Sequence, residues 1–261
     1  MTARLDATLK GSPSERLHAA LRPAHIFSRE VVTGLTDMTV TQTGEAVNAL
    51  VAQRIVTEVD GLIALTSAWA ALLAEAAHLL GSFHRAQPLI EGMPRDTLRG
   101  KLALAPNEFA ASLKFAGLQA DGTSAQPAIY AEGDWVRLAT HKVAFNADQQ
   151  QRASALLNAM RAQPWATPLV KDCVARLSQP VFDVLVRRRA LVVVSADVAF
   201  LAETYDHAVK TVRELIRQNG QITAAGVRDA VGTSRKYALA LLEHLDAIGV
   251  TRRVDDARVL R

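Results

Sequence analysis

The sequence predicts a mainly α (α+β) fold, built as four tandem copies of one small domain. Two observations predict it. The composition, with 49% hydrophobic and 21% charged residues, is typical of a chain with sizeable buried cores, and 261 residues exceed one average domain. Four segments also share one pattern, the end of an amphipathic helix followed by a strand, a polar turn and a second strand: residues 51–66, 125–140, 186–202 and 245–261.

Each of these segments indicates a β-hairpin that closes one repeat. The turns centre near Asp60, Gly133, Ala196 and Asp256, which are 73, 63 and 60 residues apart. One repeat therefore takes about 65 residues. We expect four domains, over residues 1–67, 68–141, 142–203 and 204–261.

Three helices are expected before each hairpin, in the same order in every repeat. Their apolar spacing and end signals place the helices of the first three repeats at Pro13–Leu21, Ser28–Gly34, Thr41–Ala52, Trp69–Phe83, Pro94–Lys101, Pro106–Phe115, Ala147–Met160, Pro168–Arg176 and Gln179–Arg189. In the second repeat a longer loop through Gly122 and Pro127 precedes the hairpin.

The last repeat carries the most complete set of signals. An apolar stripe predicts a long helix over Tyr205–Gln218. Thr223 is expected to cap a short helix, Gly232 to make a tight turn, and Thr233 to cap a third helix that ends near Ile248. Helix, short helix, tight turn, helix and hairpin together form the winged helix-turn-helix, so the sequence predicts four tandem winged-helix domains.

Several classes of protein lack their signals in this sequence. The longest uncharged stretch, Gly61–Ala74, is 14 residues long, against about 20 apolar residues for a membrane span. The N-terminus carries charges and no apolar core of a secretion signal. The single Cys173 excludes an internal disulfide framework, fits a reducing cytosol and is expected to be a small core residue.

No catalytic constellation is found either. Phosphate-loop, dinucleotide-binding, zinc-peptidase, CxxC and serine-hydrolase motifs do not occur. The seven histidines are scattered and are expected to be surface or packing residues. We therefore expect no enzyme activity, no metal site and no cofactor in this chain.

Charge is distributed unevenly along the chain. Residues 1–140 hold 12 Lys and Arg against 14 Asp and Glu, whereas residues 141–261 hold 18 against 12. A bound polyanion is thus expected on the C-terminal half, unless each half only has a solvated charged surface.

Cations gather around the third helix of the last repeat. If Ala238, Leu241, Leu245 and Ile248 form its buried stripe, Lys236 lies nearly opposite the core and Arg235 on its flank. The start of that helix also favours phosphate through its dipole and free N–H groups. The hairpin, or wing, adds three arginines. The alternative is that these cations form surface ion pairs with Asp229, Asp246, Asp255 and Asp256. A weaker cluster of the same kind is Arg187, Arg188 and Arg189.

Residues 225–239, AGVRDAVGTSRKYAL, followed by LEHLD at 242–246 and GVTRRV at 249–254, resemble the last winged-helix domain of the bacterial selenocysteine-specific translation elongation factors, the SelB family. FHRAQPL at 83–89 and GMPR at 92–95 resemble the second winged helix of that family. The resemblance implies four tandem winged helices, and a preceding part that binds GTP and selenocysteinyl-tRNA. Those two ligands are expected only through that part, which these residues do not include.

The resemblance implies a ligand for the cations, namely the messenger-RNA hairpin that marks a UGA codon for selenocysteine. The expected RNA-binding residues are Arg228, Thr233, Ser234, Arg235, Lys236, Tyr237, Arg252, Arg253 and Arg258. Tyr237 either stacks on a base or is a half-buried packing residue. The expected role is cytoplasmic tethering of the factor near its codon on the ribosome, with the first two domains as a spacer and no membrane partner.

Two alternatives belong to other classes of function. One is a DNA-binding regulator, because winged helices commonly insert this helix into a major groove. Against it, Glu243 and Asp246 are expected on the later outward positions, where they would face phosphates. The other is a protein-interaction scaffold, which fits the acidic, Ala-rich N-terminal half.

Overall fold

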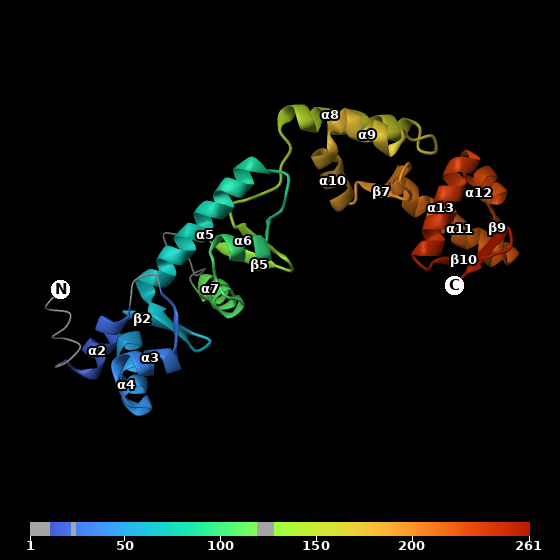
Figure 1. The fold of residues 1–261 in the computed structure, drawn as a ribbon. Coiled ribbons are helices and arrows are strands. Elements are labelled where there is room, and N and C mark those ends of the chain that lie inside the picture. Colours follow the sequence, from blue (N-terminus) through green and yellow to red (C-terminus); the bar gives the residue numbers. More distant parts are fainter. Residues whose placement is uncertain (1–10, 22–24, 119–127) are drawn as a thin grey trace. The chain divides into compact units, whose positions relative to one another are not determined.

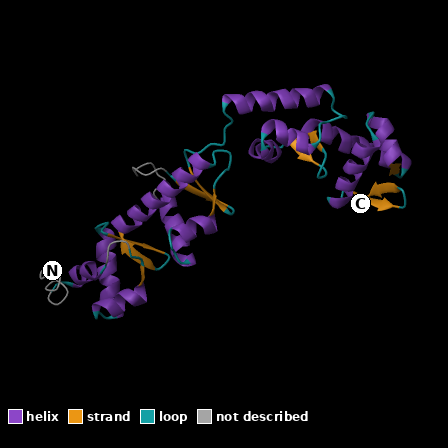
Figure 2. Cartoon of the chain, turned by 45° about the horizontal axis from the view of Figure 1, so that its top comes forward, coloured by secondary structure: helices purple, strands orange, loops and turns teal. Residues whose placement is uncertain are grey.

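The computed structural model describes residues 11–21, 25–118 and 128–261. The chain splits into two compact units, Met1–Val143 and Ala144–Arg261, and each unit holds two of the expected repeats. Helices dominate both units, and the strands form small antiparallel sheets (Figure 2). The expected loop through Gly122 and Pro127 lies outside the described residues.

The first repeat contains three helices and a three-stranded sheet of order β1-β3-β2. Its elements are α2 (Pro13–Ala20), β1 (Phe27–Ser28), α3 (Arg29–Thr36), α4 (Val40–Ala52), β2 (Val56–Val59) and β3 (Leu62–Leu65). Capping side chains fix the helix starts: Ser12 and Glu15 form a capping box on α2, and Thr39 and Gln42 form another on α4.

The second repeat has the same order of elements. It consists of α5 (Thr66–Ala86), β4 (Met93–Pro94), α6 (Arg95–Lys101), α7 (Pro106–Leu118), β5 (Ile129–Glu132) and β6 (Trp135–Leu138), with sheet order β4-β6-β5. The backbone at Gly92 lies very close to β6, because a Cβ there would be 2.7 Å from the carbonyl oxygen of Val136. Glycine thus permits the pairing of β4 with β6.

The second unit repeats this arrangement with one difference. Its elements are α8 (Ala147–Ala162), α9 (Val170–Leu177), α10 (Gln179–Arg187), β7 (Leu191–Val193), β8 (Ala199–Leu201), α11 (Ala202–Asn219), β9 (Ile222–Thr223), α12 (Ala224–Val231), α13 (Arg235–Ala247), β10 (Thr251–Val254) and β11 (Ala257–Leu260). The last sheet has the order β10-β11-β9, whereas β7 and β8 form a two-stranded sheet joined only by a bridge from Leu169 to Val198.

The four predicted hairpins are confirmed, since each expected turn lies between two paired strands. Two helices begin three residues earlier than predicted. α5 starts at Thr66 directly after β3, and α11 starts at Ala202 directly after β8. Within each unit the second repeat therefore follows the first without a linker, whereas residues 139–146 separate β6 from α8.

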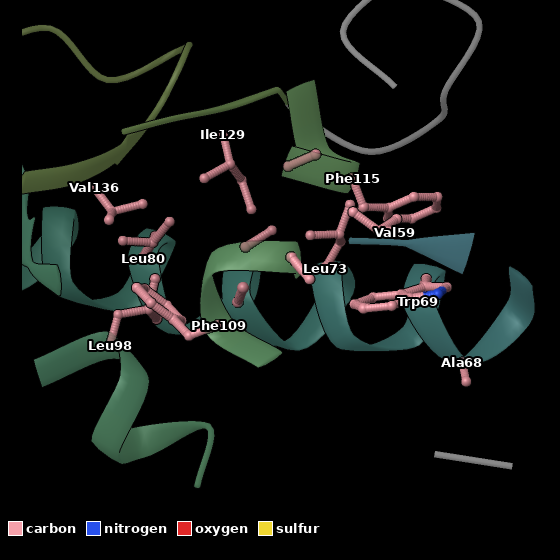
Figure 3. Packing of buried hydrophobic residues seen from close by; sticks show 14 of the residues in the cluster. Val59, Ala68, Trp69, Leu73, Leu80, Leu98, Phe109, Phe115, Ile129 and Val136 are labelled. Carbon is pink, nitrogen blue, oxygen red and sulfur yellow. The ribbon is translucent and has the colours of Figure 1, made fainter. Parts of the chain in front are cut away.

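The two repeats of the first unit share a hydrophobic core. Val59 and Leu62, from the first hairpin, pack in one cluster with Trp69, Phe115 and residues of the second sheet (Figure 3). Trp69 is fully buried, and its Nε1 donates a hydrogen bond to the carbonyl oxygen of Thr57 at 3.1 Å. Figure 1 shows α5 extending from the β2–β3 hairpin into the second repeat.

The second unit is joined in the same way. Val198 and Phe200, from the β7–β8 hairpin, pack in one cluster with Tyr205, Val212 and Leu245 of the last repeat. In both units, then, the hairpin of the first repeat contributes to the core of the second. The sequence pattern treats the four repeats as equivalent, and the structure pairs them.

Candidate nucleic-acid interface

The helix-turn-helix of the last repeat is built as the sequence predicts. The hydroxyl of Thr223 accepts a hydrogen bond from the N–H of Gly226 at 3.1 Å, which caps α12. Gly232 ends α12 in the left-handed conformation, with φ of 71°. Glycine adopts that conformation without a Cβ clash, so the chain turns there into α13.

The packing of α13 differs from the expected stripe at its end. Ala238, Leu241 and Leu245 are buried as predicted, and Leu242 is buried with them. Ile248, however, is 52% exposed. Its assignment to the core was wrong because α13 ends at Ala247, so residue 248 does not continue the helical spacing.

Ser234, not Thr233, is the N-cap residue of α13. The hydroxyl of Thr233 instead donates a hydrogen bond to the carbonyl oxygen of Trp165 at 2.8 Å. The side chain of Ser234 makes no capping bond. The first backbone N–H groups of α13 are thus left without a side-chain cap, in contrast to α4, whose start Thr39 caps.

Arg235 and Lys236 both lie exposed on the first turn of α13. Lys236 has a distant ionic neighbour, with 4.0 Å between its Nζ and Asp197 Oδ2. Arg235 has no ion pair with any residue in the described part of the chain. Two cations thus border an uncapped helix start, which is an arrangement that favours an anion.

Arg228 is already engaged. Its Nε donates to Asp229 Oδ1 at 2.7 Å, and the hydrogen bond raises the pKa of Arg228 and lowers the pKa of the Asp229 carboxyl. Both side chains are exposed, so the pair is easily exchanged for another partner. Arg228 is close to the turn in sequence, and its carbonyl oxygen accepts the N–H of Thr233.

The wing presents one open arginine and one partly paired arginine. Arg252 is exposed and, among the residues that the structure describes, has no ionic partner. Arg253 donates from Nε to the carbonyl oxygen of Asp255 at 2.8 Å and lies 3.8 Å from the Asp256 carboxylate. The wing is therefore cationic mainly through Arg252.

Arg258 is buried, whereas a residue of the predicted RNA-binding surface would be exposed. It is only 4% exposed, and its Nε donates to Asp246 Oδ2 at 3.1 Å. The other carboxylate oxygen of Asp246 accepts the hydroxyl of Thr251 at 2.6 Å. Asp246 thus joins α13 to both strands of the wing, and its expected position facing a ligand was wrong. Both charges are paired within the domain, because β11 turns Arg258 toward Asp246 on α13.

Tyr237 lies half-buried, as the packing interpretation expected. Its hydroxyl donates to the carbonyl oxygen of Thr167 at 2.7 Å, and its ring is 6.1 Å from the ring of Phe200. One edge still borders an open pocket of about 310 Å³ beside the start of α13. The walls of this pocket are Gln163, Pro164, Trp165, Ala166, Gly232, Thr233, Ser234 and Tyr237.

Half of the residues that line this pocket come from the third repeat. Sequence patterns alone do not assign them to the site. Trp165 stands in the loop between α8 and α9, and no helix or strand period includes it. Its carbonyl oxygen holds Thr233, while its ring lies 6.3 Å from that of Phe200. A tryptophan between two helices, two residues before Thr167, was the available signal.

Two arginines of the weaker basic cluster, Arg188 and Arg189, contact other residues of the second unit. Arg189 forms an ion pair with Asp206 at 3.2 Å, and the guanidinium of Arg188 lies 5.3 Å from the ring centre of Phe145. Arg187 also has an interaction partner. This cluster therefore offers less to an anion than the start of α13.

Cys173 and His84 are core residues. Cys173 is fully buried, as predicted, and burial raises the pKa of its thiol. His84 is 7% exposed and stacks on His141 with ring centres 3.8 Å apart, while neither of its ring nitrogens has a hydrogen-bond partner. Burial, together with the neighbouring His141 and Arg137, lowers the pKa of His84 to about 4.

The described residues contain neither a metal-binding cluster nor a membrane-spanning helix. No three His, Cys, Asp or Glu side chains in residues 11–21, 25–118 and 128–261 are placed to hold a metal ion. Over the same ranges, every helix is too short or too polar to cross a membrane.

Comparison with known families matches two segments. A family model described as the third winged helix of elongation factor SelB matches residues 214–260, which include α12, α13 and the wing. The model of the second SelB winged helix matches residues 77–138.

Individual proteins give the same result. The selenocysteine-specific elongation factor of Escherichia coli is 28% identical over 51% of this chain and 22% of its own length. That of Desulfomicrobium baculatum is 23% identical over 70% of this chain and 29% of its own length. A solved structure of the mRNA-binding domain of Escherichia coli SelB with SECIS RNA is 23% identical over 45% of this chain and 99% of that one, with a TM-score of 0.35. The chain thus spans less than a third of the length of the two elongation factors.

Proposed function

We propose that this chain, which is related to the C-terminal region of the SelB elongation factors, binds a messenger-RNA hairpin through its last repeat and so tethers a translation factor near UGA codons for selenocysteine. One observation carries the proposal. Arg235 and Lys236 flank the uncapped start of α13, directly beside the pocket that Trp165 and Tyr237 border. A cationic helix start that favours phosphate and a pocket with aromatic walls are thus adjacent.

These features match the chemistry of an RNA loop better than that of a DNA duplex. An unstacked base enters a pocket between aromatic rings, and the phosphate next to it meets the N–H groups and cations of the helix start. The carboxylate of Glu243, exposed further along α13, would oppose phosphates if the whole helix lay in a major groove. An RNA loop needs only the first turn of α13 and the wing.

The architecture proposed for this role is four tandem winged helices, over residues 1–67, 68–141, 142–203 and 204–261. The shared order of three helices and a hairpin in all four repeats supports it, and the two family models match segments within the second and fourth repeats. Tethering raises the local concentration of the factor at its codon without any reaction in these residues. The ribosome and the cytoplasm belong to this proposal, and none of the described residues is assigned to GTP or tRNA.

A titration at controlled salt tests the proposal. The full chain is mixed with a selenocysteine-insertion RNA hairpin, its DNA version and an unrelated RNA hairpin of equal length, at several salt concentrations. The proposal predicts at least about tenfold tighter binding of the first RNA at each salt concentration. Equal affinity for all three would reduce the surface to a general basic patch, and tightest binding of the DNA would favour a DNA regulator.

A further inference from the structure

The pairing of repeats leaves two of the four hairpins with an open outer face. The β2–β3 and β7–β8 hairpins contribute to the core of the following repeat, whereas β5–β6 and β10–β11 have no following repeat in their unit. The open face of β10–β11 is the arginine wing described above. The face of β5–β6 carries Tyr130, 49% exposed, and Trp135, 44% exposed. Among the described residues these are the two exposed Phe, Tyr or Trp side chains.

The strand register places both rings on one face. Tyr130 lies opposite Arg137, and Glu132 lies opposite Trp135. Because alternate residues of a strand share a face, these four side chains point the same way. The other face carries Ile129 and Val136, both buried in the core.

Cations border the two rings. The guanidinium carbon of Arg137 lies 5.5 Å from the ring centre of Tyr130, within the range of a cation–π contact. Arg95, at the start of α6, donates from Nη1 to the carbonyl oxygen of Gly133 in the hairpin turn at 3.2 Å. The N–H of Arg95 also donates to the carbonyl oxygen of Asp134. One guanidinium group thus lies against the ring of Tyr130, and a second is held at the turn of the same hairpin.

The β5–β6 hairpin is part of a three-stranded sheet. β6 is the central strand of its sheet, with β5 on one side and β4 on the other. Pro94 pairs with Trp135, and the backbone of Gly92 packs closely against Val136. The exposure of Trp135 therefore belongs to an ordered sheet face.

We propose that Tyr130, Trp135 and Arg137 form a platform on which unpaired bases of a single-stranded RNA segment stack. Diagonal neighbours on adjacent strands lie about 7–8 Å apart, and aromatic rings presented this way on a sheet face take successive bases. Arg137 and Arg95 meet the phosphates that connect those bases. The platform is a second RNA contact, in the first unit, and is separate from the hairpin site of the last repeat.

The acidic neighbours give the platform a distinct signature. Glu132 shares its face, and Asp134 lies in the adjoining turn, so the local charge nearly cancels. Binding there depends on stacking more than on counterion release, and its affinity therefore falls only weakly with salt. The arginine wing of the last repeat should show a steeper dependence.

The test uses the full chain with labelled 12-residue oligouridylate and oligoadenylate, in the presence of excess hairpin RNA to occupy the last repeat. Binding is followed by fluorescence anisotropy for the wild type, for Tyr130→Ala and Trp135→Ala, and for Tyr130→Phe and Trp135→Phe as matched controls. Each alanine variant should bind about tenfold more weakly or worse, while each phenylalanine variant should stay close to the wild type. The melting temperature of each variant is measured to check that it folds.

Three results would overturn the platform. The first is an affinity of the alanine variants equal to that of the wild type. The second is a loss in the phenylalanine variants as large as that in the alanine variants. The third is a wild type that binds neither oligonucleotide, which would leave the face to a protein partner. The hairpin affinity of every variant is measured alongside. If hairpin binding is absent but the oligonucleotide results hold, the proposed function fails and the platform stands.

Discussion

The hydroxyl of Thr233 donates a hydrogen bond to the carbonyl oxygen of Trp165, 2.8 Å away, and so joins the turn before α13 to the loop between α8 and α9. Tyr237 makes a second bond of this kind, to Thr167. The start of α13 is therefore positioned by the third repeat as well as by its own core. The candidate interface belongs to the second unit as a whole.

The first prediction concerns that bond. Thr233→Val keeps the side-chain shape and removes the donor, so it should lower the free energy of unfolding of the second unit by about 1 kcal/mol and weaken hairpin binding. Thr211→Val is the control, because the hydroxyl of Thr211 donates to the carbonyl oxygen of His207 on an exposed helix face. Chemical unfolding measures the free energy of unfolding of both variants, and titration measures their hairpin affinity. Equal effects of the two variants on hairpin affinity would argue against positioning by Thr233.

The second prediction separates the two arginines of the wing. Arg252→Ala should weaken binding of selenocysteine-insertion and unrelated hairpins alike and lower the salt slope by about one, since Arg252 is free to meet a phosphate. Arg253→Ala should do less, because Arg253 already bonds to Asp255 and lies near Asp256. Affinity at several salt concentrations measures both. A larger effect at Arg253 would contradict the ranking.

The third prediction concerns the buried pair of Arg258 and Asp246. Arg258→Ala leaves the Asp246 carboxylate with only the Thr251 hydroxyl, so the free energy of unfolding should fall by about 3 kcal/mol. Arg252→Ala should leave it almost unchanged. Urea unfolding compares the two variants. A stable Arg258→Ala chain that had lost RNA affinity would restore Arg258 to the interface.

The fourth prediction concerns pH. The pKa of His84 is about 4 in the folded chain, against 6.5 when unperturbed, so the unfolded state binds more protons between these values. The free energy of unfolding of the first unit should therefore fall as the pH drops from about 6.5 to about 4, by roughly 2–3 kcal/mol in total. His84→Phe keeps a ring against His141 and should flatten this dependence. Urea unfolding of both chains across that pH range is the measurement, and an unchanged slope in the variant would place the effect elsewhere.

Local signals in the sequence were enough to predict the four hairpins and the order of the helices. Turn residues such as Gly133 and the Asp255-Asp256 pair lie where the strands reverse, and strand alternation is visible over four residues. Strands β1, β4 and β9 were missed as sheet members because two residues carry no periodicity. The capping residue of α13 was placed one position early because Thr233 and Ser234 are both good caps, and only the contact with Trp165 distinguishes them.

The candidate site was predictable only in part, for a similar reason. Spacing along a helix showed that Arg235 and Lys236 face away from the core. The position of Arg258 depended on whether its strand turns it toward Asp246, twelve residues away. The pocket depended on a loop from another repeat, and the spacing of residues within one repeat does not reveal such a long-range contact.

The most direct test of the central claim is the discrimination of a double variant, Arg235→Ala with Lys236→Ala. The measurement is the ratio of affinities for a selenocysteine-insertion hairpin and an unrelated hairpin, at matched salt, for this variant and the wild type. Because packing fixes the start of α13, we predict a loss of binding free energy of about 1–3 kcal/mol per residue that falls mainly on the first hairpin, and a ratio near one in the variant. A variant that bound both hairpins equally more weakly, and kept the wild-type ratio, would contradict the claim that this helix start reads the RNA.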